Sequence, residues 1–270
     1  MFADRERYLY RKPQLLEVIC QLRFPTILSI SAREPADFQE AIRREFPQYK
    51  RVQQQTQPKV VGAPGSLRVE EGERITNYQF LSEDGKWQVN LTNGFIALTT
   101  PAYTKWEDFA AKLDLILSKF ISTYQPAYFE RVGLRFANAF SRKALELEGV
   151  PFRELFQPGY LGLLAEEDVR EEAFSLCGLD VELALSGGCR ARIHSGTGMV
   201  QRKFVEKNQV KVIQDNEVKF LLDIDVFMNG KLPVAQCAPA LQTVHLQADR
   251  IFAGAITKQL HEAMEPTELL

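Results

Sequence analysis

The chain has 270 residues, 45% of them hydrophobic and 25% charged, so it can bury one large core or two of ordinary size. Its 33 basic and 35 acidic residues give a formal net charge of -2, which argues against broad non-specific binding to nucleic acid or to an anionic membrane. No stretch reaches the roughly 18 apolar residues of a membrane-spanning helix, and the first residues, "MFADRERYLYRKPQLLEV", are too charged for a secretory signal. We therefore expect a cytoplasmic protein, with no membrane association and with nucleic acid disfavoured as a partner.

The sequence contains no pattern typical of a catalytic or metal site. Its cysteines lack metal-binding spacing, so we expect free and mostly buried thiols, no metal and no cofactor. Three histidines leave few candidates for general acid–base chemistry. Neither a GxxxxGK[ST] phosphate loop nor a GxSxG nucleophile turn is present. We therefore assign no catalytic residue.

The first half of the chain begins with a strand and a helix and continues as several strands. "LLEVICQLRF" (15–24) alternates as a strand does, and "EPADFQEAIRREFPQY" has apolar residues at helical spacing from Phe38 to Phe46 before Pro47 ends the helix. Short strands are predicted near residues 50–61, 75–81, 86–92 and 95–100. The last two are joined by an Asn-Gly turn, a strong hairpin signal.

A long amphipathic helix follows these strands. Thr104 and Glu107 have the spacing of a capping box, in which each side chain accepts a hydrogen bond from a free backbone N–H group. Apolar residues from Trp106 to Phe120 recur at helical spacing and form a wide stripe. Such a stripe is typical of a helix that lies across a sheet, so we expect Trp106 and Phe109 to be buried.

The second half has a similar order of elements. It begins with the strand "YFERVGLRFANAF" (128–140), and an irregular segment of about 141–172 follows. Further strands are predicted at 173–186, 189–195, 203–213 and 217–227, and one long helix at 239–263 closes the chain. The predicted fold class is therefore α+β, a tandem pair of strand-helix-(four strands)-helix modules with antiparallel sheets that each pack on a long helix. The modules are expected at residues 1–126 and 127–270, and their topology resembles the TATA-binding-protein-like and helix-grip folds.

Charged residues share one face of two predicted strands. In "EVKFLLDIDVF" the side chains from Val218 to Val226 alternate, with the apolar ones inward and Lys219, Asp223 and Asp225 outward. The same parity places Arg131 and Arg135 outward in the strand that opens the second half. If these strands are neighbours, the arginines reach the aspartates.

A neighbouring hairpin extends this pattern. A turn at "SGG" (186–188) would pair Ala184 with Arg190 and Glu182 with Arg192. Opposite charges across strands contribute only roughly 0.2–1 kcal/mol each, so stability is a weak reason for so many of them. We therefore predict a binding site at Arg131, Arg135, Asp223, Asp225, Glu182 and Arg192.

Several segments together resemble a sporadically distributed, uncharacterised bacterial protein family of about 250 residues. They are "KPQLLEVICQLRF", "YTKWEDF", "ERVGLRFAN", "FLLDIDVF" and the helical C-terminus. The resemblance implies a patchily inherited protein of the kind found in defence or toxin–antitoxin-type systems. It implies no catalytic residues.

Three functions remain open at this point. The favoured one is a non-enzymatic binding or regulatory protein. It would recognise a protein partner, for example one encoded by a neighbouring gene, or a small anion, through the charged residues or through the groove between the two halves. The alternative is a sensor of a small molecule or nucleotide, or an enzyme, with a pocket between a curved sheet and its long helix. Nucleic-acid binding ranks last on charge, and whether the chain forms an oligomer stays open.

Overall fold

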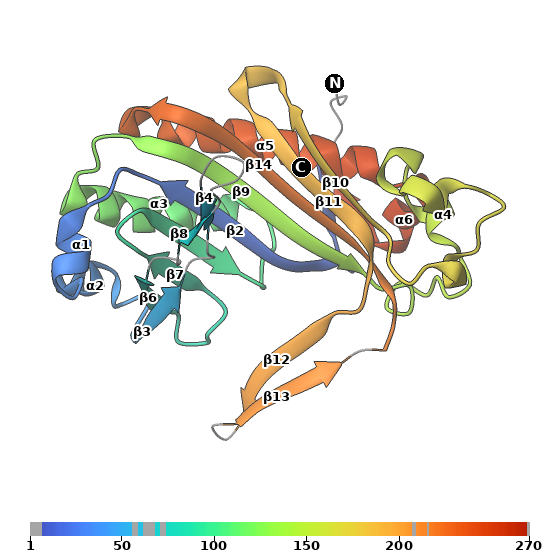
Figure 1. The fold of residues 1–270 in the computed structure, drawn as a ribbon, viewed down its shortest axis with the longest axis horizontal. Coiled ribbons are helices and arrows are strands. Elements are labelled where there is room, and N and C mark those ends of the chain that lie inside the picture. Colours follow the sequence, from blue (N-terminus) through green and yellow to red (C-terminus); the bar gives the residue numbers. More distant parts are fainter. Residues whose placement is uncertain are drawn as a thin grey trace.

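Nine strands form the main sheet in the part of the chain described by the structure, a computed structural model that covers residues 7–55, 59–61, 68–70, 74–206, 209–214 and 216–268. Each strand is antiparallel to its neighbours (Figure 1). From one edge to the other the order is β10 (Gly178–Ala184), β11 (Arg190–Gly198), β14 (Lys219–Leu232), β9 (Phe129–Phe140), β2 (Leu15–Arg23), β8 (Phe95–Thr100), β7 (Gln88–Leu91), β6 (Arg74–Leu81) and β3 (Gln48–Gln55).

The two sheets predicted from the sequence are one continuous sheet. The strands that begin the two halves, β2 and β9, pair with each other, and Cys20 lies opposite Leu134. This pairing covers two strand edges that would otherwise expose unpaired backbone groups. The α+β class with antiparallel strands is confirmed, whereas the division at residues 126 and 127 stays a prediction.

Three pairs of strands lie outside the main sheet. They are β1 (Tyr8–Tyr10) with β15 (Pro266–Glu268), β4 (Lys59–Val61) with β5 (Arg68–Glu70), and β12 (Gln201–Glu206) with β13 (Gln209–Gln214). The single strand predicted at 203–213 is wrong, because this segment forms most of the β12–β13 hairpin, which projects away from the main sheet (Figure 1). Part of the strand predicted at 50–61, namely residues 56–58, lies outside the described residues, and so do residues 207–208.

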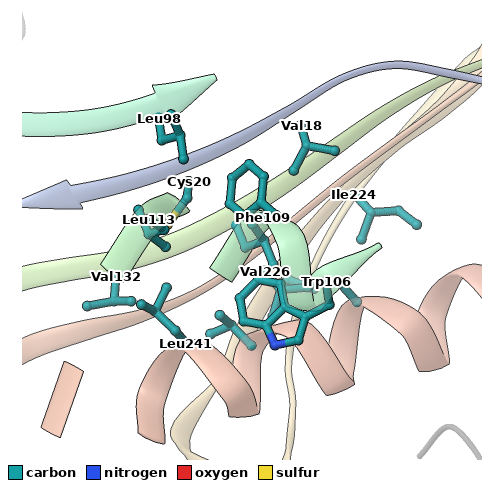
Figure 2. Packing of buried hydrophobic residues seen from close by; sticks show 14 of the residues in the cluster. Val18, Cys20, Leu98, Trp106, Phe109, Leu113, Val132, Ile224, Val226 and Leu241 are labelled. Carbon is teal, nitrogen blue, oxygen red and sulfur yellow. The ribbon is translucent and has the colours of Figure 1, made fainter. Parts of the chain in front are cut away.

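The two long helices cover the same face of the main sheet, which we call the inner face. They are α3 (Trp106–Tyr124) and α5 (Cys237–Ala255). In the core shown in Figure 2, Phe109 and Leu113 of α3 and Leu241 of α5 gather with buried side chains of β2, β8, β9 and β14. The predicted burial is confirmed, since Trp106 and Phe109 are 7% and 0% exposed.

The remaining helices are short. They are α1 (Leu28–Ala32), α2 (Ala36–Ile42), α4 (Phe152–Leu155), α6 (Lys258–Ala263), and the 3-10 helices η1 (Pro158–Tyr160), η2 (Gly162–Ala165), η3 (Glu171–Ala173), η4 (Ser186–Gly188) and η5 (Val234–Gln236). The irregular segment predicted at 141–172 is confirmed, since it contains mainly turns and short helices.

The capping box predicted at the start of α3 is wrong. The helix begins one residue later than the pattern indicated, with Lys105 rather than Thr104 at the N-cap position and no side-chain cap. The Thr104 hydroxyl instead donates a hydrogen bond of 3.1 Å to the carboxylate of Asp108.

The inward and outward parity of β14 is confirmed except at its start. Phe220, Leu222, Ile224 and Val226 are fully buried, as the alternation predicted. The strand begins at Lys219, two residues later than predicted, so Val218 lies before it and is 46% exposed. Lys219 is 8% exposed rather than outward in solvent.

The single closing helix predicted at 239–263 is two helices. Ile256 has extended backbone (φ -93°, ψ 151°), which ends α5. Thr257 then caps α6, because its side-chain oxygen accepts a hydrogen bond from the Leu260 N–H.

Candidate functional site

The six residues predicted as a binding site lie together on the outer face of the main sheet, opposite α3 and α5. We call this group, Arg131, Arg135, Asp223, Asp225, Glu182 and Arg192, the charged face. The residues that face one another across β10, β11, β14 and β9 are, in order, Glu182, Arg192, Asp225 and Arg135. Acid and base therefore alternate from strand to strand.

The predicted arginine–aspartate pairs are present, and both cross diagonally between β9 and β14. Arg131 Nη2 lies 2.7 Å from each carboxylate oxygen of Asp225. Arg135 Nε donates to Asp223 Oδ1 at 2.8 Å, and Arg135 Nη2 also contacts Asp223. The expected pairing of the strands and of the side chains is therefore confirmed, whereas binding by these residues stays a prediction.

The SGG hairpin has the predicted register, with Ala184 opposite Arg190 and Glu182 opposite Arg192. Glu182 accepts hydrogen bonds of 2.7 Å from Arg190 Nη2 and 2.8 Å from Arg192 Nε. These two bonds lower the pKa of Glu182, so it is ionised at neutral pH.

A buried aromatic ring lies within the charged face. Phe227 is 2% exposed, and the guanidinium carbons of Arg131 and Arg192 lie 4.6 and 5.5 Å from its centroid. Gly133 leaves the space for this arrangement, because a Cβ there would come within 2.2 Å of Arg131 Nη1. Arg131 therefore covers apolar surface in addition to its ion pair.

The charges of this face are largely satisfied by one another. A shallow groove of about 430 Å³ runs over Arg135, Arg192, Asp223 and their neighbours. Each arginine there already bonds a carboxylate, so an incoming anion would compete with an existing pair.

A larger pocket, of about 760 Å³, lies between the inner face of the main sheet, α5 and the segment that precedes β2. Phe136 and Ile224 contribute from the sheet, and Trp106 from the start of α3. The side of α5 that lines it includes His245, Asp249 and Phe252, which are three or four positions apart, and Ile256 lines it just after the helix ends. The volume falls within the range of about 300–1,000 Å³ that is typical of small-molecule sites.

One end of the pocket holds a cluster of ionisable side chains. Asp249 Oδ2 lies 3.4 Å from His245 Nε2 and 3.5 Å from Arg7 Nε. Arg7 Nη1 also lies 3.1 Å from Glu107 Oε1. The Trp106 ring stacks on His245 with centroids 4.2 Å apart.

Burial changes the protonation of this cluster. It lowers the pKa of His245 to about 3, with the Arg7 charge acting in the same direction, so the imidazole is neutral at physiological pH. The contact between His245 and Asp249 is therefore not an ion pair. Burial raises the pKa of Asp249 to about 6, against the opposing effect of Arg7. The Asp249 side chain is 36% exposed, and this residue lines the pocket.

A second polar group of residues lines the pocket away from this cluster. The Tyr10 hydroxyl lies 2.9 Å from His261 Nδ1, and Phe252 packs against the Tyr10 ring with centroids 5.9 Å apart. Gln157 and Thr257 line the same end. Between the two ends the walls are mainly apolar.

The sequence did not identify the residues of this pocket. His245 and Asp249 are four positions apart in the last predicted helix, which places them on one side of it, and this spacing was the available signal. Arg7 and Tyr10 are more than 200 positions from α5 in the sequence, so their approach depends on the fold.

Comparisons with family models, with curated proteins and with solved structures found no match to this chain. Among the described residues, no helix is long and apolar enough to cross a membrane. The same residues include no cluster of three or more histidine, cysteine or acidic side chains that could hold a metal ion.

Proposed function

We propose that the protein binds a small organic molecule in the pocket between α5 and the main sheet. One observation carries this proposal: a pocket of about 760 Å³ with mainly apolar walls contains a carboxylate, Asp249, that accepts no hydrogen bond from the residues the structure describes. Asp249 is partly exposed, with 36% of its side chain accessible, and its contacts to Arg7 and His245 are long. A carboxylate of this kind in a pocket can accept hydrogen bonds from a ligand.

The pocket supports this function better than the charged face supports partner binding. The functional groups of the charged face already bond one another, as described above. In the pocket, by contrast, Asp249 has only the two long contacts to Arg7 and His245, and the Tyr103 hydroxyl makes no hydrogen bond to a described residue. The pocket thus offers a ligand both apolar area and polar groups that can make further hydrogen bonds.

A ligand-observed NMR screen with a chemically diverse fragment set tests the proposal. The variant Ala253→Phe fills the pocket from α5, and Ala238→Phe makes the same change at an exposed position of that helix outside the pocket. We expect the wild type and A238F to bind a common set of fragments that A253F does not bind. Equal binding by all three proteins, or no binding by the wild type, would contradict the proposed function.

Recognition of a protein partner by the charged face is a second candidate. Its support is exposure: the side chains of Arg135 and Arg192 are 44% and 65% exposed and keep N–H groups that can donate to an acidic partner. A pull-down with the proteins of neighbouring genes, using the wild type and Arg192→Ala, tests it. Recovery of the same partner by both would remove this candidate.

The tandem arrangement of modules is also a proposal. In the main sheet, β2 pairs with β8, the last strand before α3, and β9 pairs with β14, the last strand before α5. These matching neighbours support a repeated unit.

A further inference from the structure

We propose that the ligand carries a protonated amine, which binds the carboxylate of Asp249, and an apolar body, which lies along α5. This inference rests on the proposed function and adds the chemical class of the ligand. It follows from the hydrogen bonding of Asp249, the local charge, the aromatic walls and the shape of the pocket.

Asp249 is poorly satisfied by its protein neighbours. Its Oδ2 atom lies 3.5 Å from Arg7 Nε and 3.4 Å from His245 Nε2, both beyond ordinary hydrogen-bond lengths of about 2.7–3.2 Å. An ionised carboxylate can accept several hydrogen bonds, so both oxygens have capacity for a ligand N–H group. The three donors of a primary ammonium suit a carboxylate with this remaining capacity.

The charge around Asp249 favours a cation. Arg7 lies between two carboxylates, 3.1 Å from Glu107 and 3.5 Å from Asp249, while His245 is neutral, so this group has one more negative than positive charge when Asp249 is ionised. Burial is the main cause of the raised pKa of Asp249, Arg7 opposes it, and the negative charge of Glu107 adds a smaller increase.

Other basic residues line the pocket without pairing with Asp249 in any described contact. Lys105 Nζ lies 3.8 Å from Asp108, and Lys258 Nζ lies 3.6 Å from Glu262. Arg11 follows β1, and its backbone N–H bonds the Glu265 carbonyl. Arg250 is adjacent to Asp249 in the sequence and hence about 100° away around α5.

Aromatic rings surround the same end of the pocket. Tyr103 and Phe136 meet edge to face with centroids 5.5 Å apart, and Trp106 stacks on His245, the neighbour of Asp249. Burial raises the pKa of Tyr103, so its hydroxyl stays protonated. Aromatic faces attract cations and repel anions, which favours an amine over a carboxylate as the ligand head group.

The rest of the pocket suits an extended apolar body. Within α5 the lining runs from His245 to Ala253, eight positions or about 12 Å at 1.5 Å per residue, and Ile256 extends it beyond the end of the helix. Leu15, Ile224, Ala248 and Phe252 line the pocket along this length. An unbranched alkyl chain or a small aromatic system would bury apolar area there.

The test uses three probes with one body and different head groups: octylammonium, 1-octanol and octanoate. Their affinities for the full-length protein are measured by calorimetry at pH 7.5. We expect octylammonium to bind at least tenfold more tightly than the other two.

Asp249→Asn, which removes the charge with little change in shape, should reduce octylammonium affinity at least tenfold and leave 1-octanol affinity unchanged. Asp108→Asn is the matched control, an exposed acid near the start of α3 that does not line the pocket, and should bind as the wild type does.

The pH dependence provides a second readout. The amine binds the ionised form of Asp249, so its affinity should fall as the pH drops below about 6, the pKa of that group. The D249N variant should not show this loss of affinity.

If 1-octanol or octanoate binds as tightly as octylammonium, the amine is the wrong class while the proposed function stands. If no probe binds, and the fragment screen finds no ligand lost in A253F, the amine proposal and the proposed function both fail.

Discussion

Asp249 and His245 have pKa values shifted by the same cause in opposite directions, because burial disfavours the charged form of each group. The folded protein holds the Asp249 proton more tightly than the unfolded chain does, since the pKa rises from 3.8 to about 6. The stability that this group contributes is therefore present below pH 4 and is lost as the pH rises through 6. His245 acts in the other direction: its folded pKa is lowered, so the protein loses stability as the pH falls below 6.5.

The first prediction follows from this difference. Asp249→Asn should gain stability relative to the wild type as the pH rises from 4 to 8, because the variant has no carboxylate to ionise. Urea unfolding of both proteins across this range measures the difference, and the contribution of His245 is common to both. If the free energy of unfolding of the variant does not rise relative to that of the wild type toward pH 8, Asp249 has an ordinary pKa.

The second prediction concerns Gly133. A Cβ at this position would come within 2.2 Å of Arg131 Nη1, so Gly133→Ala should displace the guanidinium from Asp225 and Phe227 and destabilise the fold by about 1–3 kcal/mol. Chemical denaturation of G133A, of Arg131→Ala and of the double variant checks this reason. In the R131A protein, Gly133→Ala should lower the free energy of unfolding much less than it does in the wild type. An equal loss in both proteins would contradict the steric explanation.

The third prediction concerns Arg135, which pairs with Asp223 at the surface. Its side chain is 44% exposed, and such pairs contribute little to stability. Arg135→Ala should therefore change the free energy of unfolding by less than about 1 kcal/mol, as measured by urea denaturation. If the second candidate function holds, the same variant should weaken partner binding much more. A large loss of stability would instead make Arg135 part of the structural framework.

At the scale of elements, the junction between α5 and α6 determines the shape of the pocket's far end. The apolar spacing continues from Ile251 to Leu260, so the pattern alone predicts one helix. The structure breaks it at Ile256, and Thr257 both caps α6 and donates a 2.8 Å hydrogen bond to the Glu154 carbonyl of α4. A tertiary contact with a segment about 100 residues away thus overrides a local pattern.

The fourth prediction tests this junction. Thr257→Ala removes the cap and should destabilise the protein by about 0.5–2 kcal/mol, the usual cost of losing a threonine N-cap. Thr257→Ser keeps the hydroxyl, so it should retain most of the stability that the alanine variant loses. Thermal unfolding of the three proteins measures this. Equal stability of the alanine and serine variants would show that the hydroxyl does not hold the two helices in place.

Sequence patterns predicted strands and their faces better than they predicted the pocket. The alternation in β9 and β14 and the turn at residues 186–188 determine which side chains share a face, so the charged face followed from local rules. The joining of β2 to β9 did not follow, because antiparallel edges carry no local signature of their partner. The pocket needs Arg7, Trp106 and Asp249 together, and only the assembled fold brings these distant residues into contact.

At the scale of the whole molecule, the main sheet separates two surfaces with different chemistry. Its outer face carries paired charges on β10, β11, β14 and β9. Its inner face, which α3 and α5 cover (Figure 1), holds the core. The pocket lies beside α5. A small molecule bound on one side and a protein partner on the other would therefore not compete for the same residues.

The central claim is that the pocket beside α5 binds a small organic molecule, and a crystal structure grown with saturating octylammonium tests it most directly. The account predicts density for the alkyl chain between α5 and the main sheet, with the nitrogen about 3 Å from a carboxylate oxygen of Asp249. Density for the probe on the charged face, or a pocket that holds no probe at saturation, would contradict it.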